Sequence, residues 1–222
     1  MKKIIPLFSL TLLCVFLLVS CGTKYYYGEQ FTYAIEDGGL TIIDVVDSSI
    51  EDLVIPESEN GRNVLSIDPN MFYDNDNIKS ISLPSTLKSI GDSCFALCDS
   101  FETITLSPSM YMVTMRSFMS CKGLKEVIIP EGIKVIEMHA FTKCENILTI
   151  MLPSTITRID SSAFYNNKSL EAVYYNGSVE DFENIKIEKY NNDYFLDNIY
   201  YYSEDYIEGN YWHYVDGNPS KW

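Results

Sequence analysis

Basic residues and histidine are scarce in this 222-residue chain. It has 16 Lys and Arg residues against 31 Asp and Glu residues, a formal net charge of −15, and only two histidines, His139 and His213. A body with this charge repels the phosphate backbone of nucleic acids and anionic lipid headgroups. Nucleic acid is therefore not an expected partner. Solubility is the ordinary meaning of such acidity, and a cationic partner is the sharper alternative.

Residues that could carry catalysis or hold a metal are also few. Enzymes usually bring a nucleophile, a base and an orienting group together. His139 is expected to face solvent, and a pair of His139 with Cys144 would use a cysteine that belongs to a structural column described below. The Asp-Asn-Asp-Asn segment at 74–77 lacks the glycine and final glutamate of a calcium loop and is predicted to be a turn. We therefore expect no enzyme activity, no cofactor and no metal.

Long apolar runs are absent after residue 20. The one such run, Ile4 to Val19, follows Lys2 and Lys3 and ends in Ser20 and Cys21. A basic start, an apolar middle and a small residue before the cut are features of a secretory signal. A cysteine directly after that small residue resembles the lipobox of bacterial lipoproteins. Residues 1–20 are therefore predicted to be a lipoprotein signal peptide.

This resemblance implies that Cys21 is diacylated and that residues 21–30 form a lipidated tether. Two acyl chains suffice for stable anchoring in a bilayer, so the lipid bilayer is an expected partner through Cys21. An uncleaved membrane anchor is the alternative, because sixteen apolar residues can nearly cross a bilayer. Both interpretations place the body on the extracytoplasmic face of a bacterial membrane, since the lysines stay inside.

A period of 23 residues dominates the rest of the chain. Every sixth and every ninth residue after the repeated phenylalanine is apolar. One such turn cannot bury its apolar side alone, whereas stacked turns share a continuous core, so a period of 20 to 29 residues is typical of a leucine-rich-type solenoid. The phenylalanines are Phe72, Phe95, Phe118, Phe141 and Phe164.

One segment of each turn has the pattern of a strand. These segments alternate inward and outward residues and are rich in Ile, Val and Thr. Pro84, Pro130 and Pro153 follow three of them and end them, because proline has no N–H for a strand ladder. Stacking in register then predicts a parallel sheet built from Lys79–Leu83, Glu102–Leu106, Glu126–Ile129 and Thr149–Leu152.

Only asparagine and cysteine occupy the position three residues after each phenylalanine. A buried Asn can bond to backbone groups left open at a bend, and a thiol tolerates the same pocket as a small apolar group with a weak donor. We interpret the column as a structural ladder. A disulfide between neighbouring turns is the alternative, because stacked strands lie at a spacing that a disulfide can bridge. The column comprises Asn75, Cys98, Cys121, Cys144 and Asn167.

With these columns in place, residues 53–176 resemble the BspA-like leucine-rich repeat family. The resemblance is carried by Leu83-Pro84, Ile90-Gly91, Phe95 and Cys98, and by the same pattern from Ile129-Pro130 onward, while Ser107 departs from it in the third turn. It implies a right-handed solenoid, mainly parallel β with short irregular or 3-10 segments and little α-helix. It also implies a non-catalytic surface adhesin whose partner is a host or bacterial surface protein.

Both ends of the five-turn solenoid at 53–176 are predicted to carry caps. Residues 31–52 alternate apolar and polar residues around Gly38 and Gly39, which indicates a hairpin. In residues 177–222, Ser178 can cap a short helix that runs to about Ile185. The aromatic residues that follow are expected to cover the last turn, and the alternative is an aromatic platform that binds polysaccharide. They are Tyr200, Tyr201, Tyr202, Tyr206, Tyr211, Trp212, Tyr214 and Trp222.

The candidate binding residues point outward from the predicted parallel sheet. Ile128, Met151 and Tyr174 follow one another at the same place in neighbouring turns. Solenoids bind along such extended faces, and exposed apolar patches often mark interaction sites. The hypothesis is that this stripe binds a protein. Ordinary sheet surface, or contact with the C-terminal cap, is the competing interpretation.

Overall fold

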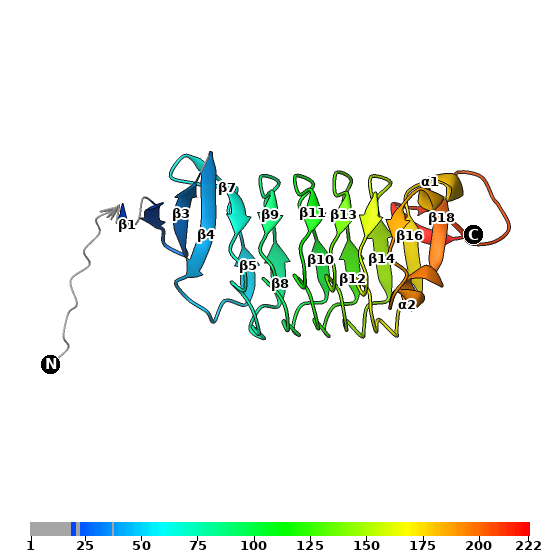
Figure 1. The fold of residues 1–222 in the computed structure, drawn as a ribbon, viewed down its shortest axis with the longest axis horizontal. Helices are drawn as coiled ribbons and strands as arrows, with labels where there is room; N and C mark the ends of the chain where they lie inside the picture. The colour runs from blue at the N-terminus through cyan, green and yellow to red at the C-terminus, as the bar shows by residue number, and fades with distance from the viewer. Residues whose placement is uncertain (1–18, 21–22, 37) are drawn as a thin grey trace.

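The chain forms an elongated coil of about seven turns with little helix. The computed structural model describes residues 19–20, 23–36 and 38–222. Figure 1 shows the turns stacked side by side along the long axis, with the C-terminal segment closing one end. The predicted solenoid is confirmed. Cys21 and most of the predicted signal peptide lie outside the described residues.

One long side of the coil is a parallel sheet, called here the first sheet. Its register repeats the 23-residue period, so that Ile104 lies beside Val127, Val127 beside Ile150, and Ile150 beside Val173. A pair of strands, β5 (Asp52–Val54) and β8 (Ser80–Ser82), begins this side. The sheet then runs through β10 (Thr103–Thr105), β12 (Glu126–Ile128), β14 (Thr149–Leu152), β16 (Ala172–Tyr175), β18 (Ile199–Tyr202), β19 (Tyr211–Val215) and β20 (Asn218–Lys221).

A second, narrower sheet forms another side of the coil. Each of its strands contributes an inward Ile or Val to the core and is short because the chain bends again within a few residues. Near the N-terminal end, β7 (Arg62–Ile67) pairs with β9 (Ser89–Ile90). The remaining strands are β11 (Met112–Val113), β13 (Val135–Ile136), β15 (Arg158–Ile159) and β17 (Lys186–Ile187).

The third side of each turn is an arc around the repeated phenylalanine. Two non-glycine residues per arc have left-handed backbone, with φ between 56° and 64°, and each costs about 1–2 kcal/mol. Hydrogen bonds between turns offset this cost. In the third turn, the N–H groups of Arg116, Phe118 and Ser120 all donate to carbonyls of the next turn at 3.3, 2.9 and 2.7 Å.

The phenylalanines form one stack through the core. Neighbouring rings from Phe72 to Phe164 are nearly parallel, with centroids 5.2, 5.6, 5.3 and 5.5 Å apart. Phe195 continues the stack at 4.4 Å from Phe164. Phe195 follows Phe164 by 31 residues, so the 23-residue period did not reveal it. The core therefore reaches one turn further than the repeat in the sequence.

The Asn and Cys column lies beside this stack and bonds to backbone. The thiols of Cys98, Cys121 and Cys144 donate to the phenylalanine carbonyl of the preceding turn at 2.9, 3.0 and 2.9 Å. Asn167 accepts from the N–H of Cys144 at 3.1 Å. These three cysteines and Cys94 are free thiols. Burial raises the pKa of Cys98 to about 12, which keeps its donor proton in place.

The N-terminal end is covered by an antiparallel hairpin, as predicted. It consists of β3 (Phe31–Glu36) and β4 (Gly39–Val45), and β2 (Thr23–Tyr27) and β1 (Val19–Ser20) extend it. Because β4 pairs in parallel with β7, the hairpin continues the second sheet directly. The loop around Asn60 and Gly61 is a smaller hairpin in which β6 (Ser58–Glu59) pairs with β7.

The prediction that the solenoid ends at residue 176 needs correction. Beyond it, β17 and β18 continue the two parallel sheets. Helix α1 (Val179–Glu183), capped by Ser178, and α2 (Asp193–Leu196) lengthen this last turn, which is why its period differs. The cap that remains is the antiparallel hairpin of β19 and β20, which turns at Asp216 and Gly217.

Candidate functional site

The outward face of the first sheet changes character along the coil. At the N-terminal end its residues are Ser and Thr, all exposed, whereas from β12 onward the corresponding column is apolar or aromatic. The backbone register is the same throughout. The polar part consists of Ser80, Ser82, Thr103 and Thr105, and the apolar part continues through Ile128, Met151, Tyr174 and Tyr200.

Tyr174 departs from the expected exposed stripe. Only 7% of its surface is exposed, because the Trp212 ring packs over it at 5.4 Å and the Tyr200 ring lies at 6.1 Å. Trp212 is fully buried, and its indole N–H donates to the Tyr175 carbonyl at 2.9 Å. The C-terminal hairpin therefore covers this end of the column. Ile128 and Met151 remain half-exposed beside it.

A shallow groove of about 180 Å³ opens where the uncovered residues meet the hairpin. We call it the β12–β14 groove. Ile128 and Met151 come from neighbouring strands, and the prolines that follow these strands, Pro130 and Pro153, also line it. Tyr214 of β19 adds an aromatic ring that is 48% exposed. The groove thus combines aliphatic surface with one ring.

The carboxylate of Glu131 also lines the groove and is tied to the next turn. It accepts hydrogen bonds from the N–H of Ser154 at 3.0 Å, the N–H of Thr155 at 3.2 Å and the amide of Asn176 at 3.0 Å. Burial by itself raises the pKa of Glu131, but these donors outweigh burial and lower it. The groove therefore contains one ionised group at a defined position.

The same column of the first sheet already holds a cation at its far end. The ammonium of Lys221 lies 4.1 Å from the centre of the Tyr200 ring. It also donates to the Glu171 carbonyl at 3.1 Å. The aromatic surface of this face thus accommodates a lysine head within the range of a cation–π contact.

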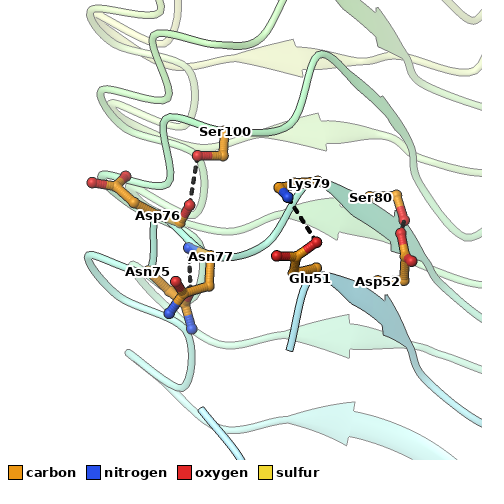
Figure 2. Close-up of polar contacts among 8 residues, drawn as sticks. All are labelled: Glu51, Asp52, Asn75, Asp76, Asn77, Lys79, Ser80 and Ser100. Atoms are coloured by element: carbon orange, nitrogen blue, oxygen red, sulfur yellow. Dashed lines mark hydrogen bonds and ion pairs between the residues drawn. The ribbon is translucent and has the colours of Figure 1, made fainter. Parts of the chain in front are cut away.

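The polar end of the face is occupied by contacts between turns. Figure 2 shows Lys79 paired with Glu51 at 2.7 Å and Ser80 donating to Asp52 at 2.5 Å. The hollow here is lined by Lys79 and Thr103 among other mainly polar residues. Exposed ion pairs contribute little free energy. This end has a hydrophilic surface with no apolar floor.

The Asp-Asn-Asp-Asn segment is a turn that joins neighbouring coils. Asn75 accepts from the N–H of Asn77 at 3.0 Å, and the Ser100 hydroxyl donates to the Asp76 carbonyl at 2.6 Å (Figure 2). The amide groups of both asparagines donate to the Ser48 carbonyl at 3.3 Å. In the part of the chain that the structure describes, no group of three or more His, Cys, Asp or Glu side chains could hold a metal ion.

The two residues considered for catalysis have separate structural contacts. Nδ1 of His139 lies 3.1 Å from the Thr142 hydroxyl, and the half-buried imidazole is not fully solvent-facing as predicted. Burial and then the charge of Arg116 lower the pKa of His139. The thiol of Cys144 donates instead to the Phe118 carbonyl in the core.

A second exposed aromatic surface lies at the tip of the C-terminal hairpin. His213 and Trp222 stack at 3.6 Å, and Tyr206 meets Trp222 edge-on at 5.8 Å. Tyr206 is 70% exposed and Trp222 is 38% exposed. His213 and Tyr214 are neighbours on β19, so the two aromatic surfaces belong to opposite sides of one strand.

Stacked turns with an extended sheet face define the class of leucine-rich repeat solenoids, which use such faces for binding. A family model described as BspA type leucine rich repeat region matches residues 63–197 in six copies. The chain belongs to this family. No curated protein matches the sequence.

Solved structures of bacterial proteins share the fold. A leucine rich cell surface protein from Faecalibacterium prausnitzii is 30% identical with a TM-score of 0.65, over 73% of this chain and 42% of that one. The leucine-rich repeat protein of T. pallidum is 20% identical with a TM-score of 0.58, over 68% and 81%. Pneumococcal vaccine antigen PcpA is 21% identical with a TM-score of 0.53, over 75% and 45%. The chain spans less than half of the F. prausnitzii protein.

Proteins of this family are typically found at the cell surface and generally act as non-catalytic repeat scaffolds. Within residues 19–20, 23–36 and 38–222, no helix has the length and apolarity needed to cross a membrane.

Sequence reasoning missed Glu131 and Tyr214 as groove residues. A signal for Glu131 was available, since it precedes Ser154 and Thr155 by one 23-residue period and a carboxylate there can accept from their N–H groups. For Tyr214 the sequence holds no such signal, because the hairpin that carries it lies outside the repeat.

Proposed function

We propose that this protein is a cell-surface binding module that attaches to a protein partner through the β12–β14 groove. The observation that carries the proposal is the pair Ile128 and Met151, apolar and half-exposed in adjacent strands where the preceding turns have threonine and serine. A rigid sheet holds both side chains, so binding requires little ordering of the protein. The resemblance to a cell surface protein of F. prausnitzii supports this role.

The proposal is tested by capture of surface proteins from host-cell and bacterial extracts with the detergent-solubilised full chain. Ile128→Ser with Met151→Ser should abolish capture, because the apolar floor of the groove is removed. Thr103→Ser with Thr105→Ser is the matched control at the polar end of the same face and should leave capture unchanged. Undiminished capture by the first variant would contradict the proposal.

We also propose that Cys21 carries the lipid that holds the module at the membrane. The support is the sequence alone: an apolar run that ends in Ser20 directly before Cys21. Mass spectrometry of the mature N-terminal peptide should find Cys21 diacylated at its new N-terminus. Cys21→Ser should move the protein out of the detergent phase, whereas Cys14→Ser, within the predicted signal peptide, should not.

The tip of the C-terminal hairpin supports a second candidate, polysaccharide binding. Trp222 and Tyr206 expose rings against which sugar faces can pack, and His213 supports Trp222 from behind. Binding to a polysaccharide array that Trp222→Ala removes would support this function. Tyr190→Ala alters a tyrosine that is 74% exposed outside this tip and serves as the control. An array without any binding would reject it.

A further inference from the structure

We propose that the β12–β14 groove receives a lysine or arginine side chain of the protein partner, with the aliphatic stem on the floor and the charged head between Tyr214 and Glu131. This inference rests on the proposed function and names the chemistry of the residue that the groove selects. It separates a cationic anchor from a purely apolar one.

The floor of the groove suits the stem of a long basic residue. Ile128, Met151, Pro130 and Pro153 present aliphatic atoms from two adjacent turns. Lysine and arginine bury their methylene groups on such surface and keep the charged head near water. The open side of the groove lets the head remain hydrated.

The two ends of the groove attract positive charge. The exposed Tyr214 ring offers its face for a cation–π contact. The Glu131 carboxylate supplies a full negative charge, and its bonds to Ser154, Thr155 and Asn176 hold it in place before any partner arrives. None of the residues that line the groove is lysine or arginine, so nothing within it neutralises Glu131.

The protein itself contains an example of this contact on the same column. Lys221 places its ammonium 4.1 Å from the Tyr200 ring, at the end of the column that the hairpin covers. Ile128 and Met151 form the uncovered end of that column. A partner's basic residue would therefore repeat, at the open end, what Lys221 does at the closed end. The net charge of −15 also favours the approach of a basic surface.

The chain offers a matched control for Glu131. Glu57 accepts from the N–H groups of Ser85 and Thr86 at 3.0 and 3.3 Å, as Glu131 does from Ser154 and Thr155. Glu57 belongs to the first turns and does not line the groove. Glu57→Gln and Glu131→Gln thus disturb the same kind of bond between turns, and only the second removes charge from the groove.

The test is an NMR titration of the full chain in detergent, labelled at its methionine methyl groups, with acetyl-arginine methylamide as the probe. The Met151 signal should shift and saturate. The citrulline analogue, which has the same shape without the charge, should bind about tenfold more weakly, as loss of a charge-assisted contact implies. Glu131→Gln and Tyr214→Ala should each weaken the arginine probe by several-fold, and Glu57→Gln should leave its affinity unchanged.

Equal binding of the arginine and citrulline probes would overturn the inference, as would no saturable shift of Met151 or equal effects of Glu57→Gln and Glu131→Gln. The capture assay separates this from failure of the proposed function. Capture that Ile128→Ser with Met151→Ser abolishes but Glu131→Gln preserves would leave the binding role intact and reject the basic anchor. Capture that survives both variants would reject the groove as the binding surface.

Discussion

The two ends of the first sheet share a backbone and differ in what they present. Between β8 and β10 the outward residues are Ser and Thr, whereas between β12 and β16 they are Ile, Met and Tyr. The strands keep one register, and the phenylalanine stack passes beneath both ends with nearly constant spacing. The repeat thus determines the scaffold, and the outward positions are free to differ from turn to turn.

The largest expected effect tests whether the interior is the same at both ends. Phe95 and Phe141 each lie between two stacked rings and are fully buried. Phe95→Ala and Phe141→Ala should each lower the free energy of unfolding by about 3–5 kcal/mol, through lost burial and a cavity. Chemical denaturation measures both. A marked difference between them would show that the core, and not only the surface, distinguishes the ends.

The second prediction concerns the cover of the apolar end. Trp212→Ala removes a fully buried indole and its hydrogen bond to Tyr175, and should destabilise the protein by about 3 kcal/mol. Limited proteolysis should then cut after residue 203, because the hairpin loses its main contact with the sheet. Trp222→Ala, which alters a partly exposed indole, should leave the cleavage pattern unchanged. Identical patterns in the two variants would mean that Trp212 does not hold the cap.

A smaller effect is expected from the open part of the apolar end. Ile128→Ser and Met151→Ser each remove a half-exposed apolar side chain, and should each cost about 1 kcal/mol, roughly half the value for full burial. Denaturation midpoints would show this, and binding of a hydrophobic dye should fall. A loss as large as that of Phe141→Ala would place these side chains in the core instead of the groove.

The smallest effect is the pH dependence of the Glu131 contact. Because its folded-state pKa lies below the ordinary value of 4.5, the stabilisation is fully present above about pH 4.5 and is lost as pH falls through the folded-state pKa. Solvent screening limits it to below about 1 kcal/mol. Glu131→Gln should therefore flatten the fall in the free energy of unfolding below pH 4.5. An unchanged acid profile would contradict the assigned hydrogen bonds.

Much of the fold could be predicted from the sequence because its cause is local and repeated. A column such as Phe72 to Phe164 has one physical solution, a shared core of stacked turns. Phe195 shows the limit of that argument. It occupies the next place in the stack although α1 and α2 lengthen its turn, and no fixed period could identify it.

By itself, the sequence determined the solenoid, the two strand columns and the thiol ladder, since these depend on the alternation of apolar residues within each 23-residue turn. Only the tertiary structure decided which outward residues remain exposed. Trp212 closes over Tyr174, and Tyr214 meets Glu131 and Met151, because a non-repeating hairpin folds back on the last strands. Such contacts join residues about 40 to 80 positions apart along the chain, and no periodic pattern records them.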